Sequence, residues 1–132
     1  MTPATDSDTE YGARIEDLRA QYRRDRESFE PPTDPPAADE AMDYLREGLG
    51  PVVMVYVDAR TNDWGVEFSE AEFEALHEAL NGYLELYTRC YGVELDADFS
   101  IRAAAELLVE THNVGDVAAM LTQVPGETGG SR

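Results

Sequence analysis

The chain has 132 residues, and its 28 acidic residues against ten basic ones, all of them arginine, give a formal net charge of −18. This length fits one domain, and an apolar fraction of 42% with seven Tyr, four Phe and one Trp excludes a disordered acidic tail. A single cysteine excludes an internal disulfide. The sequence has no apolar run of about 18 residues and no basic start followed by an apolar stretch. These features predict a cytoplasmic protein without a membrane partner.

The first expected helix covers residues 10–29, where apolar residues recur at spacings of four, three, four and seven. The stretch 10–30 also holds five of the ten arginines and carries a net charge of −1, whereas residues 31–132 carry −15. This asymmetry makes the helix the natural place for attraction to an acidic surface, either its own body or a partner.

A proline-rich segment follows at 31–36, with four of the seven prolines, and is expected to be extended and semi-rigid. The predicted organisation is therefore an N-terminal helical arm with a frayed start (1–30), this linker (31–36), a helical body (37–124) and a flexible tail (125–132).

The body is predicted to open with a short helix from Ala37 to about Glu47 that ends at Gly48, Gly50 and Pro51. Four valines between 52 and 57 favour a buried strand, although the pattern leaves a short buried helix open. The residues 65–68 offer a return strand, which would complete a hairpin.

The clearest element is a long helix over 70–91. Ser69 and Glu72 have the spacing of a capping box, and Phe68 with Phe73 forms the flanking staple pair. Gly82 in its middle predicts the close approach of a neighbouring backbone. A buried seam is predicted at spacings of three and four, formed by Phe73, Leu76, Leu80, Tyr83, Tyr87 and Cys90.

Two shorter helices complete the chain, one from about Ser100 to His112 and one that starts near Asn113. The predicted fold is mainly α, a small helical bundle with one β-strand or short β-hairpin and a proline-tethered N-terminal helical arm.

The residues that carry chemistry form no complete motif. Glu74 and His77 have the Glu-x-x-His spacing of di-iron bundles, but the second such pair and the further glutamates are missing. Asn81 stands where a zincin needs its second histidine. His112 is expected to cap a helix, and Cys90 to act as a small core hydrophobe. We therefore expect no metal and no cofactor, and the sequence favours a non-catalytic role over an enzymatic one without deciding between them.

Two further patterns favour structure over ligand binding. Tyr83, Tyr87 and Tyr91 recur every four residues and are expected to form a core stripe rather than a stacking platform. The last two helices have the order of a helix-turn-helix, but residues 113–119 lack the basic side chains that contact phosphates.

The sequence thus predicts a halophile-adapted cytoplasmic protein with a non-catalytic interaction or regulatory role that self-associates or binds a protein partner. Alternatives are a nucleic-acid-binding regulator that uses the N-terminal arginines, and a small-molecule enzyme or sensor near Tyr56, Trp64, His77 and Tyr83. The predicted partner-binding residues are those of the arm's apolar stripe and its arginine border: Tyr11, Arg14, Ile15, Leu18, Arg19, Tyr22, Arg23 and Arg26.

Overall fold

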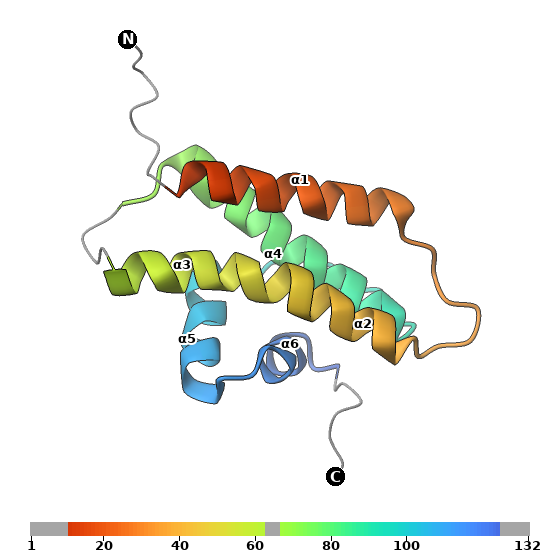
Figure 1. The fold of residues 1–132 in the computed structure, drawn as a ribbon. Helices are drawn as coiled ribbons and strands as arrows, with labels where there is room; N and C mark the ends of the chain where they lie inside the picture. The colour runs from red at the N-terminus through yellow and green to blue at the C-terminus, as the bar shows by residue number, and fades with distance from the viewer. Residues whose placement is uncertain (1–10, 63–66, 125–132) are drawn as a thin grey trace.

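A computed structural model describes residues 11–62 and 67–124, and this part of the chain is a bundle of helices (Figure 1). The mainly-α prediction is confirmed. In chain order the elements are α1 (Gly12–Ser28), α2 (Ala38–Tyr44), a π-helical turn η2 (Leu45–Leu49), α3 (Gly50–Asn62), α4 (Glu70–Cys90), α5 (Ile101–Thr111) and α6 (Val114–Thr122).

Helix α4 is the centre of the bundle, and it packs chiefly against α1 and also against α2 and η2 (Figure 1). Its start is the predicted capping box, in which Ser69 Oγ accepts from the Glu72 N–H and Glu72 Oε1 accepts from the Ser69 N–H. The predicted seam is confirmed as core. Phe73 is half-buried, and the other members are almost fully buried: Leu76, Leu80, Tyr83, Tyr87 and Cys90.

The predicted β-strand or hairpin is wrong. Residues 52–57 lie inside α3, and the described residues contain no strand. Valine costs only a few tenths of a kcal/mol more than the best helix formers, so tertiary packing overrides its preference for strands. Val52, Val53 and Val55 are fully buried in the core. Of the expected return strand, residues 65 and 66 lie outside the described residues, and Phe68 leads directly into α4.

The helix expected to end at residue 47 instead continues through Gly48, Gly50 and Pro51 as η2 and α3. Proline has no N–H and crowds the carbonyl four residues before it, which is here that of Glu47. The π-helical turn widens the backbone just before Pro51, and Gln21 of α1 donates to the Glu47 carbonyl at 2.7 Å. A side chain from another helix thus supplies a donor at the point where proline cannot.

Helix α1 is fastened to α4 by an aromatic ring over a glycine. A Cβ placed on Gly82 would lie 2.1 Å from Cζ of Tyr22, so only glycine leaves room for this ring. The ring is 5% exposed and lies edge-on to Tyr83 with 5.4 Å between centroids. Close approach at Gly82 was predicted, but the neighbour is a side chain of α1 rather than a backbone.

Candidate functional site

The apolar stripe of the predicted partner-binding set faces the chain's own core. Ile15 and Tyr22 are buried, and Leu18 is half-buried against the same core. Tyr11 packs near Phe68, with 6.2 Å between ring centroids. These side chains hold α1 on the bundle, so Ile15 and Tyr22 have almost no surface left for a partner.

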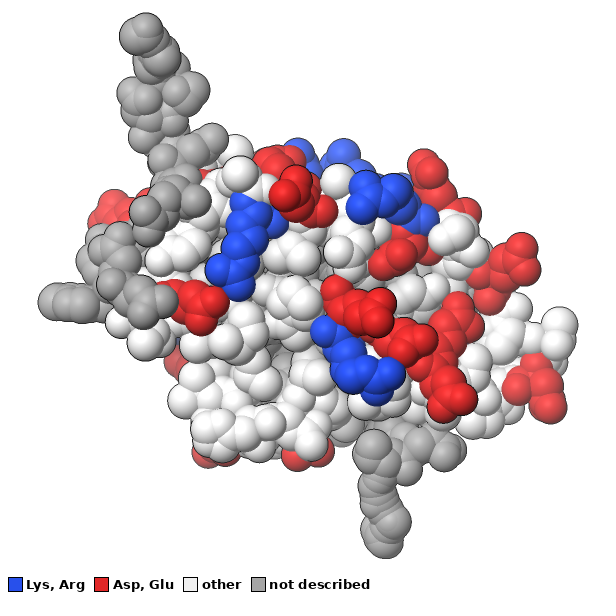
Figure 2. Space-filling view, in the orientation of Figure 1, with Lys and Arg blue, Asp and Glu red and all other residues white. Residues whose placement is uncertain are grey.

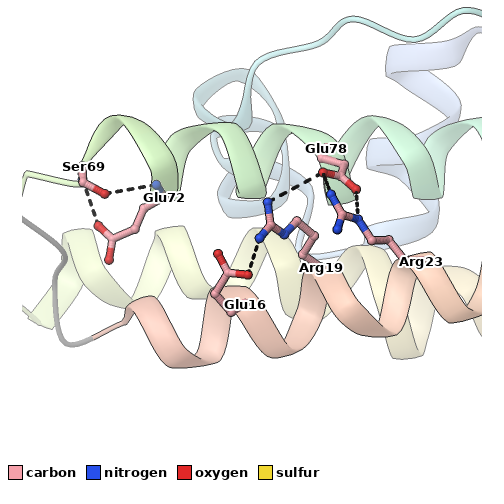
Figure 3. A network of polar contacts seen from close by, with 6 residues as sticks. All are labelled: Glu16, Arg19, Arg23, Ser69, Glu72 and Glu78. Atoms are coloured by element: carbon pink, nitrogen blue, oxygen red, sulfur yellow. Dashed lines mark hydrogen bonds and ion pairs between the residues drawn. The ribbon is translucent and has the colours of Figure 1, made fainter. Parts of the chain in front are cut away.

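Two arginines of the same set, Arg19 and Arg23, contact carboxylates of the chain itself (Figure 3). Arg23 makes a two-pronged contact with Glu78 of α4, at 2.6 and 2.9 Å, and Arg19 lies between Glu16 and Glu78. These contacts lower the pKa of the Glu78 carboxyl. The arm therefore docks on its own acidic body, which was one of the two outcomes open from the sequence.

The two remaining arginines of the set also turn toward the chain. Arg14 reaches Asp58 of α3 at 3.1 Å, and the Arg26 guanidinium lies 5.8 Å from the centre of the Tyr22 ring. A nucleic-acid phosphate could contact Arg14 only by displacing Asp58 from it.

Three polar side chains on one face of α4 bind the segment that leads to α5. His77 Nε2 accepts from the Ile101 N–H at 3.1 Å, and Asn81 both donates to and accepts from the Phe99 backbone. Glu85 Oε2 accepts from the Ala97 N–H at 2.9 Å. His77 and Asn81, which were compared with metal-binding motifs in the sequence, therefore position the start of α5.

No catalytic arrangement appears among the titratable groups that the structure describes. Burial raises the pKa of the Cys90 thiol to about 12, so it stays protonated and unreactive at neutral pH. Tyr83 donates to Asp25 Oδ2 at 2.6 Å, and burial together with this bond raises the pKa of the phenol. Across residues 11–62 and 67–124, no three His, Cys, Asp or Glu side chains come together as metal ligands.

His112 ends α5 by its backbone. It adopts a left-handed conformation, with φ 56°, and its N–H donates to the Leu108 carbonyl. The predicted capping position is confirmed, although the imidazole itself is exposed.

The most distinctive surface is an apolar groove between α3 and α5. A hollow of about 360 Å³ lies between these helices. Met54 and Val109 are 37% and 57% exposed, unusually open for large apolar side chains in so acidic a protein. We call this surface the α3–α5 groove, and the residues that line its hollow are Met54, Val57, Leu108, Val109 and His112.

A second hollow of about 410 Å³ extends the groove along the same two helices. Val57 and Val109 line both hollows, so the two are adjacent. The second one adds Arg60 of α3 and Arg102 of α5 to an otherwise largely apolar wall. In Figure 2 the surface over α5 that faces the viewer is mostly white, with red at its lower edge, whereas red and blue side chains crowd α1 and α2.

Sequence reasoning missed this groove for two reasons. Assigning 52–57 to a strand hid the fact that residues 51–57 of α3 are apolar all round, which leaves one apolar side open even when the others are buried. On α5 the buried residues are Ile101, Ala104 and Ala105. Three consecutive apolar residues at 107–109 cannot all point inward on a helix, and this was the available signal for an exposed Val109.

Of the residues considered for a small-molecule site, Tyr56 lines the hollow of about 410 Å³. His77 and Tyr83 are engaged in the contacts described above, and Trp64 lies outside the described residues.

The part of the chain that the structure describes is all-helical, and it has an apolar groove between α3 and α5. The chain matches the family described as "Domain of unknown function (DUF8055)" over residues 9–126, and it belongs to that family. Neither the curated proteins nor the solved structures contain a match to this chain. Within the described residues, none of the helices combines the length and the apolar character needed to cross a membrane.

Proposed function

We propose that this is a halophile-adapted, non-catalytic interaction protein of the cytoplasm, and that it self-associates through the α3–α5 groove. The observation that carries the proposal is the exposure of Met54 and Val109 beside an apolar hollow, on a chain whose net charge is −18. Exposed apolar patches on otherwise polar proteins mark interaction surfaces.

Charge favours a second copy of the chain as the occupant. Two molecules of net charge −18 repel each other, and this repulsion is smallest where the facing surfaces are uncharged. Among the described residues, those that line the hollow of about 360 Å³ include no Asp, Glu or Arg. At molar salt, where the Debye length is about 3 Å, the remaining repulsion is screened and apolar contact can hold two copies together.

The shape of the surface also suits a two-fold contact. In such a contact the same patch meets itself, so a protruding side chain of one copy must find a recess in the other. Val109 and Met54 are exposed, and both line the hollow between α3 and α5. A second copy turned by 180° can therefore insert one of these side chains into the hollow.

The test is the mass of the protein in solution at molar KCl, measured by light scattering after size-exclusion chromatography. The wild type is expected at twice the chain mass of 14.6 kDa. Val109→Asp and Met54→Asp, which place a charge in the contact, should each return it to a single chain mass.

The matched control is Val93→Asp, because Val93 is 37% exposed like Met54 but lies in the segment after α4. This variant should keep the mass of the wild type. A wild type of single chain mass at millimolar protein concentration, or a mass that Val109→Asp leaves unchanged, would contradict self-association through the groove.

The adaptation to salt has its own test. Because residues 31–132 carry −15, helix content measured by circular dichroism should fall between molar and millimolar KCl. An unchanged spectrum at low salt would argue against the halophile interpretation.

A further inference from the structure

A histidine of α4 holds the start of α5. The Nε2 atom of His77 accepts a hydrogen bond from the Ile101 N–H at 3.1 Å. Ile101 is the first residue of α5, and the first N–H groups of a helix have no partner within the helix itself. Ser100 Oγ accepts from another of these groups, the Ala103 N–H. The imidazole is therefore part of the cap of α5, although it lies on a different helix.

This contact requires a neutral imidazole. A backbone N–H can only donate, so the Nε2 atom that it faces must carry a lone pair rather than a proton. The ring is held in place by Phe73, with 6.0 Å between ring centroids and an interplanar angle of 15°. An imidazolium in the same position would direct an N–H at the Ile101 N–H and would lie at the positive end of the α5 dipole. Proton uptake and this hydrogen bond therefore exclude each other.

No carboxylate is placed to stabilise a proton on His77. Within the described part of the chain, the imidazole takes part in no ion pair, and its hydrogen bond is the one to Ile101. The charged residues of α4 near His77 and of the segments around it contact other groups or make no contact with the imidazole: Glu74 and Glu78 on α4, Asp58 and Arg60 on α3, Asp98 before α5, and Arg102 and Glu106 on α5.

We propose that His77 is a pH-sensitive latch for α5. When the imidazole takes up a proton, at about pH 6.5 for an ordinary histidine, the Ile101 N–H loses its acceptor and the first turn of α5 detaches from α4. Asn81 and Glu85 continue to hold the segment before α5, so the change is confined to the start of that helix.

The latch also bears on the α3–α5 groove, because α5 supplies Leu108 and Val109 to the groove. A helix that is loosened at its start presents these side chains less rigidly, so acid should weaken the association of two copies. This effect on the groove rests on the proposed self-association, whereas the latch itself does not.

Hydrogen exchange of the Ile101 amide tests the latch in the full-length, isotope-labelled protein at constant molar KCl. Its protection factor, corrected for the intrinsic effect of pH on exchange, should fall by about tenfold or more between pH 7.5 and 5.5, because an ordinary imidazole becomes mostly protonated over this range. In His77→Gln the side-chain carbonyl can accept the same bond without titrating, so the protection of Ile101 should stay constant. The Ala97 amide, which donates to Glu85, should keep its protection in both proteins.

The matched control is His112→Asn, which removes the other histidine of the chain and places asparagine, a residue that tolerates the left-handed backbone, at this position. It should keep the pH dependence of Ile101 protection. The ¹⁵N shifts of the wild-type His77 ring at pH 7.5 should show a proton on Nδ1 and none on Nε2, a measurement that depends on no variant.

A proton on Nε2 at pH 7.5, a wild-type Ile101 protection factor that is the same at both pH values, or a His77→Gln variant that loses protection in the same way would overturn the latch. The mass in solution at the two pH values reports separately on the groove. A protein that is a dimer at pH 7.5 and stays equally dimeric at pH 5.5, while the latch opens, would contradict only the effect on the groove. A single chain mass at pH 7.5 would contradict self-association itself.

Discussion

Replacing Gly82 with alanine tests whether α1 belongs to the core. The new Cβ would lie 2.1 Å from Cζ of Tyr22, about 1.4 Å closer than the roughly 3.5 Å at which carbon atoms make optimal contact. The ring cannot move away freely, because it is buried against Tyr83. Overpacking of this kind costs about 1–3 kcal/mol, and alanine recovers about 1 kcal/mol through its higher helix propensity. A clash of this size belongs at the upper end of the range, so we expect a net loss of about 2 kcal/mol.

Urea unfolding in molar KCl measures this loss. The matched background is Tyr22→Leu, in which the ring is absent and the same Gly82→Ala change should be neutral or stabilising by up to about 1 kcal/mol. A Gly82→Ala variant that is more stable than the wild type, as an unhindered glycine-to-alanine change in a helix would be, refutes the packing of Tyr22 on α4.

Leu80→Ala should lower the free energy of unfolding by about 2–5 kcal/mol in urea, because the side chain is fully buried; a loss of a few tenths would mean that the seam is exposed. Gln21→Leu removes the donor to the Glu47 carbonyl and should lower the free energy of unfolding by about 0.5–1.5 kcal/mol. Gln21→Glu keeps the size of the side chain but also lacks that donor, so it should lose as much. An unchanged urea midpoint in both variants would show that Gln21 does not support the turn. Because the pKa of Glu78 is lowered by Arg23, its stabilising contribution is present above the unfolded-state pKa, near 4.5, and is lost as the pH falls through the lower folded value. The melting temperature of Glu78→Gln should therefore lie below that of the wild type at neutral pH and converge with it in acid, and a constant difference down to pH 2 would contradict this.

The long helix and its cap could be predicted because their signals are local. Ser69 and Glu72 lie three residues apart, and the seam repeats every three or four residues, so both patterns are complete in the sequence. The structure of residues 45–57 depends on distant residues. Whether Pro51 ends a helix is decided by the π-helical turn and by Gln21, which is thirty residues away in the chain. A local pattern contains neither piece of information.

The candidate surface was harder to predict than the fold for a similar reason. An apolar stripe with an arginine border, as at Ile15 and Arg23, has the same pattern whether it contacts another molecule or the chain's own acidic body. The deciding fact is the position of Glu78 and Asp58, which only the folded chain shows. The groove, in turn, depends on which side of α3 its neighbours leave uncovered.

The most direct test of the account is to find which side chains touch across two copies. An equimolar mixture of isotope-labelled and unlabelled chain in molar KCl, measured by isotope-filtered NOE spectroscopy, reports contacts between molecules only. Self-association through the α3–α5 groove predicts contacts from the methyl groups of Met54, Val57 and Val109. Contacts from Leu18 of α1 instead, or none between molecules, would contradict it.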